Sequence, residues 1–177
     1  MKKIVAVIWH TTASRMRAII PKVADEVKLV VYSARLLSQG DERFDDLCRD
    51  LDDADFFLFN RTSGDSIWPQ IDEYVKEKTV PVAYIGSDAL SNITDPKMLE
   101  VSAHCNEYHT YSGTENMVNL VRYCASRAGD TDIVYAPPRQ TPWEGVFHPD
   151  DPDQVYATAQ EYFLQHPKSR KGVVGLM

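Results

Sequence analysis

The sequence lacks the glycine-rich motifs that cradle phosphate groups. Its 177 residues include eight glycines, and neither G-x-G-x-x-G nor G-x-x-x-x-G-K-[ST] occurs among them. The usual dinucleotide-binding and P-loop sites are therefore excluded. H-E-x-x-H and G-x-S-x-G are also missing, so the common zinc-protease and serine-hydrolase signatures are excluded as well.

Cysteine is scarce, and long apolar runs are absent. Cys48, Cys105 and Cys124 are an odd number without C-x-x-C spacing, which predicts reduced thiols and a cytoplasmic location. No apolar run approaches about 18 residues, so we expect no membrane span. The opening MKKIVAVIWH lacks the long apolar region and cleavage site of a signal peptide.

Basic clusters are also rare in this chain, whose formal net charge is −7. The one locally positive stretch is Lys168–Lys171 near the end. Nucleic-acid binding is therefore not expected, because phosphate contacts need clustered Lys and Arg. The length suits one large domain, or one and a fraction, that folds without disulfides.

Apolar runs alternate with amphipathic helical patterns in the first half of the chain. The runs predict buried strands at Ile4–Trp9, Leu29–Tyr32, Asp55–Asn60 and Val80–Ile85. The patterns predict helices at Ala13–Val27, Asp41–Ala54 and Ser66–Lys78, with N-caps at Thr12 or Ser14, Asp41 and Asp65. Pro21 should kink or shorten the first helix. This alternation predicts an α/β fold with a doubly wound, mostly parallel sheet, flavodoxin-like or Rossmann-like.

The pattern is less regular after Gly86. We predict helices at Asp95–Ala103, Gly113–Ala128 and Asp153–Gln165, and extended pieces at Ile133–Tyr135 and Gly172–Met177. The predicted organisation is an α/β domain over 1–136, a proline-rich connector over 137–152, and a helix and strand over 153–177 that begin a further α/β unit. A strand-like run at the last residue predicts that the chain is a fragment of a longer protein.

Ligands of doubly wound sheets bind beyond the carboxyl ends of the strands, near the switch point. The predicted strand ends bring polar residues there, and we select as candidate ligand-binding residues His10, Thr11, Arg61 and Ser87. A helix N-terminus beside Thr11 would add backbone N–H donors for a carboxylate or phosphate. Ser, Thr and Asn are equally common as capping and turn residues, so a structural role stays open.

The densest histidine and cysteine cluster is His104-Cys105-x-x-x-His109. On a helix Cys105 and His109 share a face, but no second pair follows at structural-zinc spacing. We therefore predict a polar helix end or turn there, and no metal site. His148 with Asp150 and Asp151 could bind a cation, although a proline-bounded turn that caps the next helix is the preferred interpretation. No catalytic residue can be assigned.

Three segments together resemble one known family. Pro142–Asp150 resembles P-x-x-G-[IV]-[YF]-H-P-D, and Ser112–Leu120 resembles G-G-x-E-N-x-x-N-L with Ser112 where glycine is common. Glu161–Phe163 followed by Gly172–Met177 resembles E-Y-L … V-G-[IL]. The segments are similar in order and spacing to the CobN/H-subunit family, the large subunits of ATP-dependent cobaltochelatase and magnesium chelatase.

The resemblance implies which substrates the protein binds, which partner subunits it works with, and which subunits hydrolyse ATP. The substrates are a tetrapyrrole and a metal ion, cobalt or magnesium, and ATP is hydrolysed by AAA-type ATPase partner subunits. The chain would be a head region that is inactive by itself. Trp143 and Phe147 would anchor a packed connector, and His148 is a further candidate for ligand contact.

Two other functions remain open from the sequence. The first is a stand-alone flavodoxin-like module for a small anion or flavin, since Thr11–Ser14 resembles a flavin phosphate loop without its glycine. The second is a docking domain that recruits the other chelatase subunits through an acidic surface.

Overall fold

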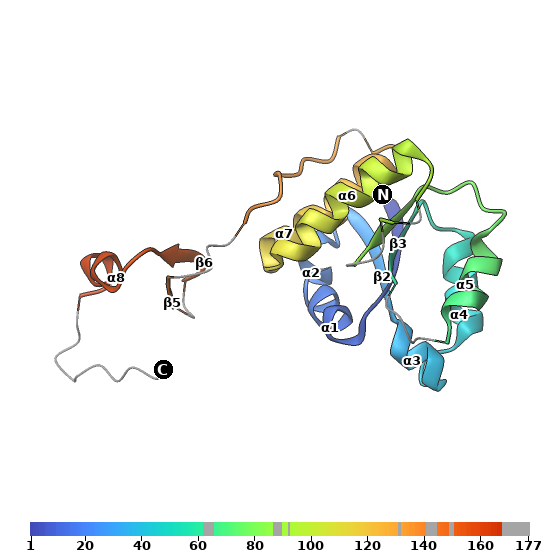
Figure 1. Cartoon of the computed structure of the whole chain (residues 1–177), viewed down its shortest axis with the longest axis horizontal. Helices are drawn as coiled ribbons and strands as arrows, with labels where there is room; N and C mark the ends of the chain where they lie inside the picture. The colour runs from blue at the N-terminus through green and yellow to red at the C-terminus, as the bar shows by residue number, and fades with distance from the viewer. Residues whose placement is uncertain are drawn as a thin grey trace. The chain divides into compact units, whose positions relative to one another are not determined.

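The computed structural model describes residues 1–61, 66–86, 90–91, 93–130, 132–140, 145–148 and 151–167. The chain divides into two compact units, Met1–Arg139 and Gln140–Met177 (Figure 1). Among the described residues, no helix combines the length and the apolar character that crossing a membrane requires.

A parallel sheet forms the centre of the first unit. Its strands are β1 (Lys2–Ile8), β2 (Val27–Ser33), β3 (Phe56–Asn60) and β4 (Val82–Ile85), in the order β2-β1-β3-β4. Each described pairing is parallel, as predicted. The central strands β1 and β3 are buried almost throughout because helices cover both faces of the sheet.

Helices cover the two faces of the sheet in two groups (Figure 1). One face packs against α1 (His10–Ala18), α2 (Ile20–Val23), α6 (Pro96–Tyr111) and α7 (Thr114–Arg127). The other packs against α3 (Ala34–Gln39), α4 (Phe44–Asp52) and α5 (Trp68–Val75). Successive residues of β1 contribute to opposite cores, which confirms the doubly wound α/β fold.

The first predicted helix is divided at Ile19, and Pro21 lies in the first turn of α2, so the expected interruption is confirmed. The predicted caps were wrong where the structure describes them. Trp9 precedes α1, so Thr12 and Ser14 lie inside that helix, and Arg43 rather than Asp41 precedes α4. Asp65 lies outside the described residues.

The helix expected at Asp95–Ala103 is longer, because α6 continues to Tyr111. Two of its polar side chains bind the backbone at the end of β4. Ser102 Oγ accepts a hydrogen bond from the Tyr84 N–H at 3.0 Å, and Asn106 Oδ1 accepts one from the Gly86 N–H at 2.9 Å. The helix therefore satisfies backbone donors along β4 that another strand would otherwise pair.

The second unit contains a strand pair and a helix: β5 (Val146–His148), antiparallel β6 (Asp151–Tyr156) and α8 (Ala159–Gln165). The expected helix Asp153–Gln165 was therefore wrong in its first part. Val155 and Tyr156 pair with β5 instead, and the hydroxyl of Thr158 accepts from the Glu161 N–H, which starts the helix later. The predicted connector over 137–152 was expected to have no regular structure, and this was wrong at β5. Trp143 and the predicted strand at 172–177 lie outside the described residues.

Candidate functional site

The switch point of the sheet lies between β1 and β3. The chain passes from β1 to β2 on one side and then returns to place β3 on the other side of β1. The carboxyl ends of these strands, after Ile8 and at Asn60, therefore flank the position where ligands of doubly wound folds bind. We call this region the carboxyl edge.

At the end of β1, the chain turns directly into α1. His10 is the first residue of the helix, and its Nδ1 lies 3.3 Å from Ser33 Oγ at the end of β2. Thr11 is exposed on the first turn. No side chain caps this terminus and its first turn has no acidic residue, so its N–H groups and the helix dipole favour an anion there. The neighbouring Trp9 is 38% exposed.

At the end of β3, Arg61 is exposed and already paired. Its Nη2 donates to Asp72 Oδ2 at 2.6 Å, and its guanidinium lies 5.9 Å from the centre of the Trp68 ring. The pair is partly exposed on both sides, so water competes with it and its energy is modest. A ligand carboxylate could take the place of Asp72.

The last residue of β3 takes part in a buried amide–imidazole pair that the sequence did not indicate. Asn60 is 3% exposed, and its Nδ2 lies 3.1 Å from Nε2 of His109 on α6. Burial lowers the pKa of His109, which keeps its ring neutral at pH 7. A neutral ring that accepts at Nε2 carries its proton on Nδ1. Asn60 Oδ1 is buried and has no hydrogen-bond partner.

The structure places the predicted site residues in different parts of the chain. His10, Thr11 and Arg61 lie at the carboxyl edge, around the switch point. Ser87 lies outside the described residues, and His148 belongs to the second unit. Asn60 and His109 are separated by 49 residues, and the position of Asn60 at the end of a buried strand was the one available signal.

His109 lies in the last turn of α6, whereas His104 and Cys105 lie farther from its end, so the expected polar helix end is confirmed for His109 alone. The members of this cluster face different neighbours, since His104 packs against Tyr123 and Cys105 Sγ lies 3.9 Å from Cys124 Sγ. The described residues contain no group of three or more histidine, cysteine or acidic side chains that could bind a metal ion.

The asparagines of the Ser112–Leu120 segment bind the chain that leaves the first unit. Asn116 Nδ2 donates to the Arg139 carbonyl at 2.8 Å, and Asn116 Oδ1 accepts from the Arg139 N–H at 2.9 Å. Asn119 Oδ1 accepts from the Ala136 N–H at 2.8 Å. The segment therefore fixes the path of the extended residues 132–140.

The family comparison matches this same part of the chain. The model of the family described as CobN/Magnesium Chelatase matches residues 106–177. The chain carries a CobN/magnesium chelatase family region. The matched range begins within α6 and includes both asparagines of α7 and the whole second unit.

Two longer proteins resemble this chain over most of its length. An uncharacterised protein of Methanocaldococcus jannaschii is 26% identical over 179 residues, covering 99% of this chain and 13% of the relative. The catalytic subunit of cobaltochelatase from Mycobacterium tuberculosis superimposes with a TM-score of 0.56 at 16% identity. That match covers 84% of this chain and 12% of the subunit, and at this identity it shows the shared α/β fold.

Proposed function

We propose that the chain is a head region of the large subunit of an ATP-dependent metal chelatase, and that its carboxyl edge binds part of the tetrapyrrole substrate. The observation that carries the proposal is a set of polar groups at the switch point, in a chain whose residues 106–177 match the chelatase family. Those groups are the uncapped α1 terminus, His10 and Arg61. They stand where α/β sheets of this kind bind ligands.

The edge matches two features of such a substrate. Tetrapyrroles carry carboxylate side groups, and the Arg61 guanidinium and the N–H groups at the start of α1 are suitable donors for them. A tetrapyrrole also has a broad apolar face. The exposed ring of Trp9 offers a surface against which such a face can pack.

Metal insertion and ATP hydrolysis belong to other parts of the assembly in this proposal. The metal ion is a substrate, and AAA-type ATPase subunits would be the partners that hydrolyse ATP. Cobalt with a corrin is favoured over magnesium with a porphyrin, because the structural neighbour is a cobaltochelatase subunit. The head region would bind substrate without inserting metal.

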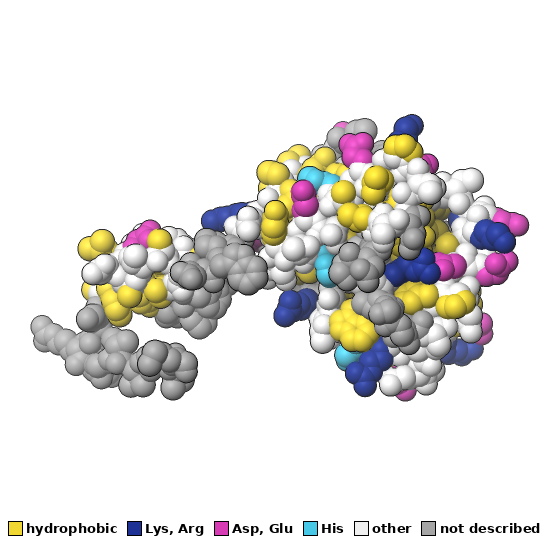
Figure 2. All heavy atoms as spheres, viewed as in Figure 1, with side chains coloured by type: hydrophobic (Ala, Val, Ile, Leu, Met, Phe, Trp, Pro, Cys, Tyr) yellow, Lys and Arg dark blue, Asp and Glu magenta, His cyan; other side chains and the backbone are white. Residues whose placement is uncertain are grey.

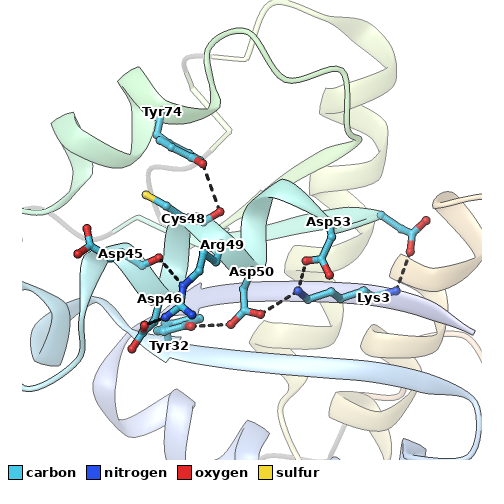
Figure 3. A network of polar contacts seen from close by, with 10 residues as sticks. Lys3, Tyr32, Asp45, Asp46, Cys48, Arg49, Asp50, Asp53 and Tyr74 are labelled. Atoms are coloured by element: carbon cyan, nitrogen blue, oxygen red, sulfur yellow. Dashed lines mark hydrogen bonds and ion pairs between the residues drawn. The ribbon is translucent and has the colours of Figure 1, made fainter.

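The acidic-docking alternative has less support from the described surface. Acidic and basic side chains are interspersed over the visible face of the first unit (Figure 2). Several carboxylates in α4 and just after it are already paired with cations of the chain, since Asp50 and Asp53 pair with Lys3 and Asp46 pairs with Arg49 (Figure 3). The flavin alternative rested on the resemblance of Thr11–Ser14 to a flavin phosphate loop. These residues lie within α1 and not in a loop, so that support is lost.

Titration of the purified chain with hydrogenobyrinic acid a,c-diamide and with protoporphyrin IX tests the proposal. We expect saturable quenching of tryptophan fluorescence by one macrocycle. Arg61→Ala should weaken that binding about tenfold, which corresponds to one lost charge-assisted hydrogen bond. Arg122→Ala is the matched control, because Arg122 also forms an exposed ion pair, with Glu26, but lies near the amino ends of β1 and β2. No quenching by either macrocycle, or equal effects of both variants, would contradict the proposal.

A further inference from the structure

The outer edge of the sheet at β4 is covered only in part. The Phe57 N–H donates to the Pro81 carbonyl at 2.9 Å, so the backbone groups of Val82, Tyr84 and Gly86 point away from β3. Side chains of α6 accept from the N–H groups of Tyr84 and Gly86. The N–H and carbonyl of Val82 form no hydrogen bond with any residue that the structure describes, so the edge is open at this position.

The sequence of α6 explains why the cover stops there. Ser102 and Asn106, the two residues that accept from the edge, lie four residues apart on one face of the helix, and Met98 lies on the same face one turn earlier. A methionine thioether is only a weak acceptor and does not replace a hydroxyl or amide oxygen. The Val82 N–H therefore has no counterpart to the other two contacts.

A cavity of about 520 Å³ lies at this open position, between the start of β4 and the first turns of α6. Its volume is in the range of sites that bind ligands. Half-buried apolar side chains line it from both elements, namely Val80, Val82, Met98 and Val101. The backbone groups of Val82 thus border an apolar cavity that is accessible from outside.

The rim of this cavity carries an excess of uncommitted positive charge. The Asp95 carboxylate caps α6, where it accepts from the N–H groups of Lys97 and Met98. Lys97 and Arg127 are exposed, and neither forms an ion pair with a residue in the described part of the chain. Glu100 is the other acid among the described lining residues. Two cations therefore accompany one free carboxylate, which favours an acidic partner.

We propose that the open part of β4 is a docking site for an extended segment of a partner protein, which adds a strand to the sheet and carries aliphatic side chains flanked by acidic ones. In an antiparallel ladder, the residue opposite Val82 would accept from its N–H and donate to its carbonyl. The aliphatic side chains would enter the cavity, where their removal from water favours binding. Pro81 does not obstruct this pairing, because its backbone faces β3.

The docking site goes beyond the proposed substrate site. The macrocycle would bind at the carboxyl ends of β1 and β3, whereas Val82 is the first residue of β4. Each site can therefore fail its test without affecting the other. A second copy of the chain is disfavoured as the occupant, because pairing this edge with itself about a two-fold axis would bring its excess positive charge together.

Nuclear magnetic resonance of the full ¹⁵N-labelled chain tests the docking site with the peptide acetyl-Glu-Val-Val-Val-Glu-amide as the probe. We expect saturable shifts of the Val82 and Met98 amides and slower exchange of the Val82 amide proton with water, while the His10 amide at the carboxyl edge stays unchanged. The same peptide with a central N-methylvaline lacks one backbone donor and should bind at least about tenfold more weakly. A peptide with lysine in place of both glutamates should also bind more weakly at low salt.

Equal affinities for the methylated and unmethylated peptides would overturn the proposal, as would the absence of shifts with any of the three. Protection of the Val82 amide proton that rises with protein concentration in the free chain would also overturn it, because a second copy would then occupy the edge.

One variant connects the shifts to the named atoms. Met98→Gln places an amide oxygen on the helix face that already covers the rest of the edge, so it should weaken peptide binding about tenfold. Leu99→Gln is the matched control, because Leu99 is exposed and does not line the cavity, and it should leave the affinity unchanged. Undiminished binding by folded Met98→Gln would overturn the proposal. If that variant fails to fold, the ratio of the methylated and unmethylated peptides on the unchanged chain decides.

Discussion

The side chain of Asn116 forms two hydrogen bonds with the backbone of Arg139, one in each direction. Its Nδ2 also donates to the Ser112 carbonyl at 2.7 Å, so each polar atom of the amide has a partner. Asn119 binds the N–H of Ala136 in the same extended segment. The asparagines of the family-like Ser112–Leu120 segment thus act as anchors for the last residues of the first unit.

We therefore expect Asn116→Leu to lower the free energy of unfolding by roughly 1–3 kcal/mol, because it leaves the N–H and carbonyl of Arg139 without their partner. Residues 132–140 should also become more sensitive to protease. Denaturant unfolding and limited proteolysis measure the two effects. Gln70→Ala, on an exposed position of α5, should change stability by less than about 0.5 kcal/mol. Equal effects of the two substitutions would show that the anchor contributes little.

His109 should make the first unit sensitive to acid. Burial lowers the pKa of His109 in the folded chain, so the unfolded chain binds a proton more readily once the pH falls toward about 6.5. Stability is therefore retained above that pH and lost below it. His109→Gln preserves an acceptor for Asn60 and should reduce the pH dependence of the urea midpoint between pH 7.5 and 5.0. His104→Gln is the control. An unchanged pH dependence in His109→Gln would contradict the conclusion that His109 causes the acid sensitivity.

The buried Lys3 side chain pairs with two carboxylates at the surface, Asp50 in α4 and Asp53 just after it (Figure 3). Burial disfavours its charged form, but hydrogen bonds and charge attraction from Asp50 and Asp53 outweigh this and raise the pKa of Lys3. Tyr32 also donates to Asp50, at 2.6 Å. Replacing Lys3 leaves Asp50 partly buried without its cation.

We expect Lys3→Met to cost roughly 1–3 kcal/mol of unfolding free energy, less than for a fully buried pair because water reaches the carboxylates. The matched control is Lys2→Met, since the side chains of Lys2 and Asp55 are 32% and 34% exposed and their pair is more strongly screened. Chemical denaturation of both variants measures the difference. If Lys2→Met lowers the unfolding free energy as much as Lys3→Met, burial of Lys3 does not strengthen its ion pairs.

The sequence predicted the parts of the fold that depend on continuous burial. The apolar runs ending at Trp9 and Asn60 predicted β1 and β3, and hence the edge that brings His10 and Arg61 together. It missed α3, which begins where Ser33 accepts from the Leu36 N–H, because a serine after a strand equally favours a turn.

Other features depend on tertiary contacts that periodicity does not encode. In the second half of α6, Asn106 accepts from the N–H of Gly86, just after β4, and an apolar pattern gives no sign of such a polar contact. Val155 and Tyr156 were compatible with a helix face until their pairing with β5 was known. The Asn60–His109 pair forms between distant elements, so it could not be assigned before the fold.

The measurement that tests the central claim most directly is a residue-by-residue map of macrocycle binding. Hydrogenobyrinic acid a,c-diamide would be titrated into the ¹⁵N-labelled chain, while the indole signals of Trp9 and Trp68 and the amide of Gly86 are followed. We expect these signals to shift together with one saturation curve, while the Glu26 and Arg122 amides near the amino ends of the strands stay unchanged. Shifts confined to the amino-end residues, or none at the carboxyl edge, would contradict a substrate site at this edge.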